Sequence, residues 1–412
     1  MERLLVTNIG LLATPEGRAA RGGSAQGAVR TLRDAWVLIE GGVIAALGTG
    51  QPAPAEGVRV LDAGGRLATP GLVDAHTHLI FGGWRQDELA LKLRGVPYLD
   101  ILAQGGGILS TVRATRAASQ EALEDKARLA VDEMLSFGTT TCEAKSGYGL
   151  DTETELRQLR AIRALNRTHP VDLVSTFLGA HALPEEFKND RPGYLRLLCE
   201  EMIPAAAGEH LAEFCDVFCE TGVFTAEESR AILEAGRRHG LLPKIHADEI
   251  DPIGGSQLAG EMRAASAEHL IVCPAEGIAA LAAGGVTACL LPATSFYLGA
   301  AYAPARAMVE AGVPVALATD FNPGSCPCLN MQLVMSLGCL KYRLTPEEVL
   351  TAATLNGAAA IGLADRTGSV EPGKWGDLVL WEAGDLNYIT YRLGSNLART
   401  VIKKGVLYGR ER

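Results

Sequence analysis

The sequence predicts an α/β fold, a (β/α)8 TIM-like barrel, with a small β-sandwich domain formed by both chain termini. Three observations predict it. Short apolar runs alternate with helix-like periodicity over residues 67–369, a pattern typical of parallel α/β folds. Strand-like runs dominate residues 1–66 and 370–412. Polar side chains collect just after the central strands, where barrel enzymes carry their active sites.

Composition narrows the class of protein. The chain of 412 residues is 48% apolar and 21% charged, with a net charge of −10, so nucleic acid is not the expected partner. The N-terminus lacks the pattern of a signal peptide, and no apolar segment reaches about 18 residues, so no membrane contact is expected. Nine cysteines without framework spacing predict reduced thiols in a cytoplasmic enzyme.

The two ends of the chain contain the strands of the smaller domain. Apolar runs lie at 4–6, 35–39, 43–47 and 58–61, and again at 377–381 and 400–402. Glu40-Gly41-Gly42 is a hairpin signal between two of these runs. The polar, glycine-rich stretch 16–27 is expected to be a surface loop.

The middle of the chain contains eight predicted strands. They lie at 72–75, 139–144, 173–178, 214–218, 244–245, 266–267, 288–291 and 313–319. Helical periodicity separates most of them, as at 121–137 and 151–166. The helix at 225–239 begins with a Thr-x-x-Glu capping box, Thr225 to Glu228.

The first of these strands ends in His76-Thr77-His78. Side chains alternate along a strand, so the two histidines point the same way. Two adjacent imidazoles form half of a site for a metal such as zinc. The alternative is that both are hydrogen-bonded polar residues at a strand end.

Polar residues follow seven of the eight strands, and five of the eight histidines are among them. In chain order they are His76 and His78, Glu143 and Lys145, His181, Glu220, His246 with Asp248 and Glu249, Glu268 and His269, and Asp320 with Asn322. Catalytic zinc sites use three protein ligands and keep one position open for water. We therefore predict one divalent metal ion, Zn²⁺ or iron, bound by His76, His78, His246 and Asp320. The alternative for His246 and Asp320 is hydrogen bonding at the barrel rim.

Several motifs resemble the amidohydrolase superfamily and, within it, the imidazolonepropionase family over nearly the whole chain. These motifs are His76-Thr77-His78-Leu79-Ile80-Phe81-Gly82-Gly83-Trp84-Arg85, Gly105-Gly106-Gly107-Ile108, Lys145-Ser146-Gly147-Tyr148-Gly149-Leu150, Gly179-Ala180-His181, His246-Ala247-Asp248-Glu249 and Thr319-Asp320-Phe321-Asn322-Pro323-Gly324-Ser325. A small β-sandwich made from both termini is also a feature of that superfamily.

The resemblance implies hydrolysis of 4-imidazolone-5-propanoate to N-formimidoyl-L-glutamate in histidine degradation. It implies that Arg85 holds the propanoate carboxylate, which suits a planar guanidinium. Tyr148 and His181 would line the ring, with His181 polarising the carbonyl.

Glu249, His269 and Asp320 would handle protons or support the water. Asn322, Gly324 and Ser325 would form a polar loop against the substrate or product. Arg85 and Tyr148 could instead be a surface arginine and a packing aromatic. A homodimer is also expected.

A second metal ion is not indicated, and two alternatives to an imidazolonepropionase are left at this stage. Lys145 could be the carboxylated lysine of a binuclear centre, but that role belongs after the fourth strand, where Glu220 stands. The chain could be another amidohydrolase, such as an aminopurine or cytosine deaminase. It could also be a non-catalytic scaffold, although such a protein is expected to have lost metal ligands.

Overall fold

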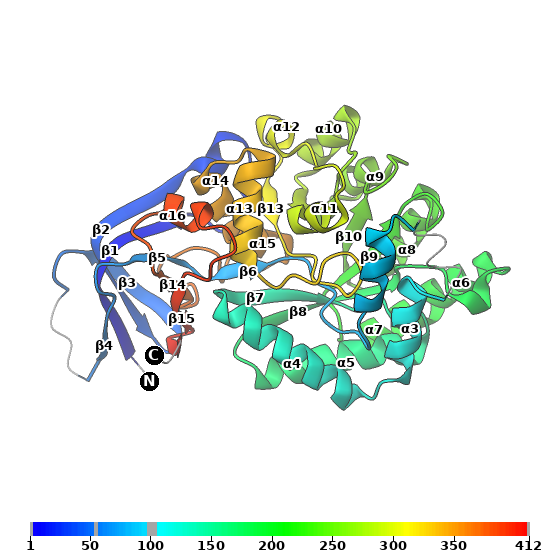
Figure 1. Cartoon of the computed structure of the whole chain (residues 1–412), viewed down its shortest axis with the longest axis horizontal. Coiled ribbons are helices and arrows are strands. Elements are labelled where there is room, and N and C mark those ends of the chain that lie inside the picture. Colours follow the sequence, from blue (N-terminus) through cyan, green and yellow to red (C-terminus); the bar gives the residue numbers. More distant parts are fainter. Residues whose placement is uncertain (1–2, 53–56, 97–104, 410–412) are drawn as a thin grey trace.

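The computed structural model describes residues 3–52, 57–96 and 105–409. Eight parallel strands pair in chain order and form the predicted barrel (Figure 1). They are β6 (Leu72–Asp74), β7 (Thr139–Lys145), β8 (Asp172–Ala180), β9 (Phe214–Cys219), β10 (Leu242–Ala247), β11 (Ser266–His269), β12 (Thr287–Leu290) and β13 (Val315–Leu317). Each of the eight strands predicted from the sequence is present.

The first and last strands meet through the residues that follow them. Thr77 and Phe321 form a parallel bridge, and the Asp320 N–H donates to the carbonyl of His76 at 3.0 Å. The Asp74 carboxylate accepts hydrogen bonds from the backbone N–H and the hydroxyl of Thr319 at 3.0 and 2.6 Å. These contacts place the residues after β6 beside those after β13.

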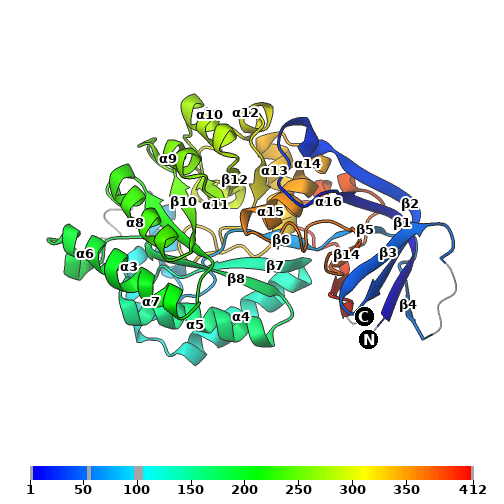
Figure 2. The same cartoon turned by 180° about the vertical axis from the view of Figure 1, so that it is seen from behind.

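Helices surround the barrel (Figure 2), and some of them also close its two ends. They are α1 (Leu89–Leu93), α3 (Ile108–Ala117), α4 (Gln120–Ser136), α5 (Thr152–Thr168), α6 (Arg191–Leu197), α7 (Ile203–Gly208), α8 (Ala226–Arg238), α9 (Gly255–Met262), α10 (Ala275–Gly284), α11 (Pro292–Leu298), α12 (Ala305–Glu310), α13 (Met331–Tyr342), α14 (Pro346–Ala352), α15 (Leu355–Ala360) and α16 (Leu386–Tyr391). The capping box at Thr225 is confirmed. None of the helices in the described ranges is long and apolar enough to cross a membrane.

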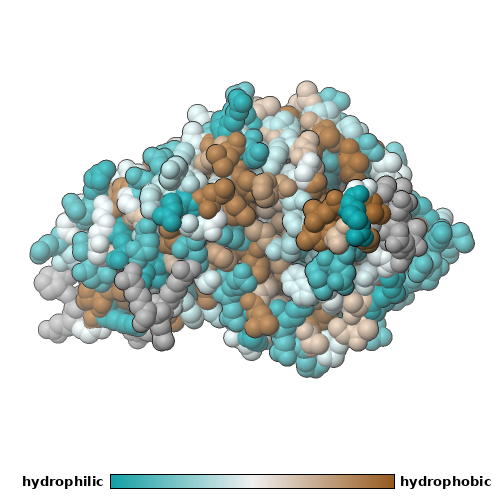
Figure 3. Space-filling model, in the orientation of Figure 1, coloured by the Kyte–Doolittle hydropathy of each residue, from teal (hydrophilic) through white to brown (hydrophobic). Residues whose placement is uncertain are grey.

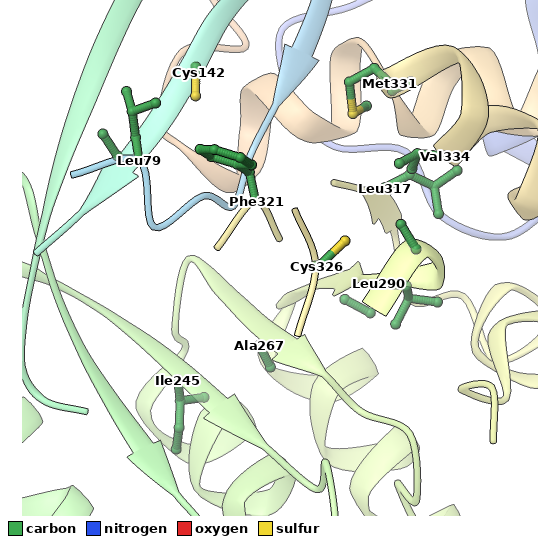
Figure 4. Close-up of a cluster of buried hydrophobic side chains, with 14 of the residues drawn as sticks. Leu79, Cys142, Ile245, Ala267, Leu290, Leu317, Phe321, Cys326, Met331 and Val334 are labelled. Atoms are coloured by element: carbon green, nitrogen blue, oxygen red, sulfur yellow. The ribbon is translucent and has the colours of Figure 1, made fainter. Parts of the chain in front are cut away.

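The barrel core has two parts. Outward side chains of the strands pack against the helices, as Figure 4 shows for Ile245, Ala267, Leu290 and Leu317, with Met331 and Val334 of α13 nearby. Inside the barrel, Val73, Phe214 and Ala316 pack near α15. Buried polar and charged residues occupy the rest of the barrel interior, toward the carboxyl ends of the strands. The candidate site therefore lies at the end of the barrel opposite this apolar layer.

The termini form a second sheet of eight strands with its own apolar core. Its order is β16 (Val406–Gly409), β15 (Ala398–Lys403), β14 (Leu378–Trp381), β5 (Leu67–Pro70), β1 (Arg3–Pro15), β2 (Val29–Glu40) and β3 (Val43–Thr49), and β4 (Arg59–Asp62) pairs with β1. The strands are joined in one continuous sheet, and β1 has an irregularity between Val6 and Ile9. The domain limits at residues 66/67 and 369/370 stay a prediction.

The stretch 16–27 differs from the predicted surface loop. Its end is a short 3-10 helix, Gly23–Gly27, in which Gln26 is completely buried. The Gln26 amide donates to the carbonyls of Val315 and Glu348, and its Oε1 accepts from the Val315 N–H at 3.0 Å. The composition of this stretch did not predict the contact, because one side chain, Gln26, makes it within a polar, glycine-rich sequence.

Candidate active site

The barrel brings the four predicted metal ligands together at the carboxyl ends of its strands. The ring centres of His76 and His246 are 4.7 Å apart, and those of His76 and His78 are 5.2 Å apart. Asp320 Oδ1 lies 3.5 Å from His76 Nε2 and 3.6 Å from His78 Nε2. His269 joins them, because ligand atoms of His76, His246 and His269 lie within 4.8 Å of one another.

The donor atoms fit a divalent metal ion. Nε2 of His76 and of His246 is buried and has no hydrogen-bond partner among the residues that the structure describes. Burial lowers the pKa of His76 and of His78 well below the usual range, so both rings are neutral and offer a lone pair. Neutral imidazoles with one carboxylate are a donor set that zinc and iron accept.

Two carboxylates orient these imidazoles: Glu268, which the sequence placed at a strand end without a role, and Asp216, which it did not single out. Glu268 Oε2 accepts a hydrogen bond from His76 Nδ1 at 2.8 Å, and Asp216 lies 3.0 Å from His246 Nδ1. A carboxylate fixes the proton on Nδ1 and leaves Nε2 facing the site. Burial opposes charge on His246, but Asp216 outweighs it and raises its pKa. An acidic residue inside the apolar run 214–218 is the signal that could have revealed Asp216.

Two lysines form ion pairs with these carboxylates and with Glu143. Lys145 Nζ donates to Glu143 at 2.9 Å and to Asp216 at 2.7 Å. Lys244 Nζ lies 2.8 Å from Glu143 and 3.4 Å from Glu268. All five side chains are completely buried, and such charges persist only when paired. Lys145 is therefore a counter-ion below the cavity.

Asp320 is held in place by its own backbone and by one side chain. Its φ of 56° lies in the left-handed region, which turns the chain directly after β13. Thr294 of α11 donates to Asp320 Oδ2 at 2.6 Å, while Oδ1 faces the histidines. Burial raises the pKa of this carboxyl. Sequence reasoning missed Thr294 because no strand-end pattern marks it.

Glu249 and His269 face each other beside the proposed ligands, with 3.6 Å between Oε2 and Nδ1. Burial, opposed by His246 and reinforced by Glu220, raises the pKa of Glu249 to about 7. Burial lowers the pKa of His269 to about 4. Glu220 accepts hydrogen bonds from the N–H groups of residues 250 and 251 at 2.9 and 3.0 Å. It thus fixes the turn that follows Glu249.

A cavity of about 690 Å³ opens from this centre. Every residue predicted to bind the substrate lines it, namely Arg85, Tyr148, His181, Glu249, Asn322, Gly324 and Ser325. Apolar side chains of α1 and α11 also line it, including Leu89, Leu93, Phe296 and Leu298, and Figure 3 shows a hydrophobic area around these two helices. The cavity therefore combines a polar floor with an apolar rim.

Arg85 forms part of the cavity wall in a fixed orientation. Its Nε and Nη2 donate to the two oxygens of Glu88 at 3.0 and 2.8 Å. The Gly107 N–H donates to the same carboxylate at 2.7 Å. A Cβ at Gly324 would lie 2.1 Å from Arg85 Nη1, so any other residue there would displace the guanidinium from its present position.

The loop after β7 places Tyr148, and the end of β8 places His181, next to the predicted ligands. His181 stacks on His78 with 4.8 Å between ring centres, and its Nδ1 lies 2.9 Å from the Gly147 carbonyl oxygen. Burial lowers the pKa of His181 to about 3. A carbonyl only accepts, so the neutral ring carries its proton on Nδ1 and has an acceptor at Nε2. The buried Glu155 carboxylate holds this loop through three backbone N–H groups.

Asn322 shapes the polar loop that the sequence predicted. Its Oδ1 accepts from the N–H groups of Gly324 and Ser325 at 2.8 and 2.7 Å, and its Nδ2 donates to the Asp320 carbonyl at 2.7 Å. The side chain therefore ties the loop to the end of β13.

Known proteins resemble the chain in both sequence and structure. The model of the amidohydrolase family matches residues 67–408. Imidazolonepropionase from Alkaliphilus metalliredigens is 52% identical over 99% of this chain and 98% of its own length. That from Bacillus cereus is 50% identical over 97% and 95%.

Solved structures share the fold at low identity. An adenosine deaminase from Xanthomonas campestris with bound zinc has a TM-score of 0.72 and 21% identity, covering 98% of this chain and 92% of its own. The E. coli guanine deaminase has a TM-score of 0.76 and 16% identity over the whole of both chains. The chain belongs to the amidohydrolase family and, within it, to the imidazolonepropionases.

Proposed function

We propose that the chain hydrolyses the ring amide of 4-imidazolone-5-propanoate to N-formimidoyl-L-glutamate. One arrangement supports this most strongly: a single cavity contains a metal-compatible donor set and a fixed arginine. Relatives of the same length and half-identical sequence carry the name of this activity.

His76, His78, His246 and Asp320 would hold the metal ion, with His269 adjacent. A divalent ion in such a site supplies Lewis acidity, which lowers the pKa of water and polarises a carbonyl. Zinc and iron both suit these donors. Because Glu268 and Asp216 hold the Nδ1 protons of His76 and His246, these two imidazoles need no reorientation to bind.

Arg85 would bind the propanoate carboxylate, since its guanidinium is always positively charged and Glu88 fixes its orientation. Tyr148 would contact the ring. His181 would accept an N–H of the ring at Nε2, because its proton stays on Nδ1 at the Gly147 carbonyl. This differs from the carbonyl-polarising role that the sequence suggested, which needs a proton at Nε2.

The remaining groups would move protons. In the overall reaction, water adds to the ring carbonyl carbon, the amide C–N bond breaks, and the leaving nitrogen takes a proton. Asp320 Oδ1 would accept the proton of the water, and Glu249, with its pKa near 7, would deliver one to the nitrogen. His269 would donate to the oxygen that gains charge. Asn322, Gly324 and Ser325 would shape the opposite wall.

Turnover of 4-imidazolone-5-propanoate with metal quantification tests the proposal. We expect loss of imidazolone absorbance without ammonia release, and about one metal ion per chain. H246A should lose both metal and turnover. Ammonia release from an aminopurine or cytosine, with stable imidazolone, would instead identify a deaminase. Inactivity on all substrates after loading with zinc or iron would favour a scaffold.

Three further features belong to the proposal. The native ion is zinc or iron, the chain forms a homodimer, and the location is cytoplasmic. All nine cysteines are free thiols, which agrees with a reducing compartment. Leu340 and Leu393 are 62% and 56% exposed, and the homodimer would cover such leucines.

A further inference from the structure

Lys92 of α1 lines the cavity next to Arg85. Its Nζ donates to the Gly324 carbonyl at 2.7 Å and lies 3.8 Å from Glu88 Oε2. Gly324 also packs against the Arg85 guanidinium. Arg85 and Lys92 therefore both contact Gly324 of the polar loop. A single small anion in the cavity could contact both side chains.

Two cations meet on this wall of the cavity. Arg85 and Lys92 both lie against the carboxylate of Glu88, with Nη2 of Arg85 at 2.8 Å and Nζ of Lys92 at 3.8 Å from its Oε2. They are the only lysine and arginine among the described residues that line the cavity. Burial and the nearby Arg85 lower the pKa of Lys92, a cost that a bound anion would offset.

We propose that Lys92 is a second carboxylate-binding residue, which shares the propanoate group of the substrate with Arg85 and so determines specificity for a substrate that carries an anion. The inference rests on the function proposed above. An ammonium has three N–H donors. Lys92 uses one at Gly324, and a second faces Glu88 at 3.8 Å. The third can reach a carboxylate held by Arg85.

The test compares Lys92→Met with Arg94→Met. Arg94 follows α1, is exposed and does not line the cavity, so its replacement removes the same charge from the same segment. The probes are 3-(imidazol-4-yl)propanoate and its primary amide, measured by calorimetry on metal-loaded protein. A charge-assisted hydrogen bond predicts that Lys92→Met weakens binding of the carboxylate by about 10- to 100-fold and leaves binding of the amide unchanged.

Lys92→Arg should recover most of the affinity, and Arg94→Met should bind both probes like the parent protein. In turnover, Lys92→Met should raise KM by a similar factor with little change in kcat or metal content. Equal weakening for the carboxylate and the amide, or none for either, would overturn the role of Lys92. Failure of the parent protein to hydrolyse the imidazolone would overturn the proposed function itself.

Discussion

Asp320 depends on a single side-chain hydrogen bond for the position of its carboxylate. Thr294 holds Oδ2 at 2.6 Å, so Thr294→Val removes the donor and keeps the shape. We expect kcat/KM to fall by about 10- to 100-fold, the range for losing a hydrogen bond to a charged group. Steady-state kinetics and metal content measure this.

Two further variants test whether the loss of activity in Thr294→Val comes from the missing hydroxyl. Thr294→Ser keeps the hydroxyl and should restore most of the activity. Thr351→Val is the matched control, because the buried Thr351 hydroxyl has no hydrogen-bond partner among the described residues. Normal kinetics for Thr294→Val would show that the Asp320 carboxylate keeps its position without this contact.

At the residue scale, the sequence predicted the side chains that face the cavity better than those that support them. His76 and His246 stand directly at strand ends, where polar residues have few other reasons to gather. Thr294 and Glu155 reach the site from helices, and no periodicity marks such contacts. Asp216 is hidden because an apolar run around it predicts only a buried strand.

The turn after β10 sets both the position and the acidity of Glu249. The Glu220 carboxylate accepts hydrogen bonds from the backbone N–H groups of residues 250 and 251, and its negative charge raises the pKa of Glu249. In Glu220→Gln that charge is gone, so the pKa of Glu249 should fall below about 7. Because Glu249 delivers a proton in the proposed mechanism, its protonated form is the active one, and the alkaline limb of the kcat/KM–pH profile should move to lower pH.

The control for this profile is Glu227→Gln, an exposed carboxylate on α8. Glu227→Gln removes the same charge without touching the turn, and the alkaline limb of its profile should match that of the parent protein. If the alkaline limb stays in place in Glu220→Gln, then Glu249 is not the group that sets it. Circular dichroism would confirm that the fold is intact.

At the element scale, strands and long helices were predictable and the joining segments were not. The eight barrel strands and the capped helix α8 follow from local periodicity and one local motif. The stretch 16–27 depends instead on Gln26 reaching Val315 and Glu348, about 300 residues away in the chain. Local composition carries no information about such a partner.

At the scale of the whole molecule, the metal site joins distant parts of the chain. His76 follows the first barrel strand, His246 ends the fifth, and Asp320 follows the last. A shared ion would therefore cross-link the barrel where β6 and β13 already meet through Thr77 and Phe321. A metal ion bound there would therefore stabilise the fold in addition to serving the reaction.

This cross-link predicts that metal binding stabilises the whole barrel. An ion that binds only the folded chain adds about 4 kcal/mol to the free energy of unfolding at 1,000 times its Kd. Chelated protein should unfold at a lower temperature than the metal-loaded form in calorimetry, and added zinc should reverse the change. In His76→Ala the zinc-dependent shift should vanish, because that ligand ties β6 to the site. The exposed His210 offers the matched control: His210→Ala should keep the full shift, and an equal shift in His76→Ala would mean that zinc acts elsewhere on the chain.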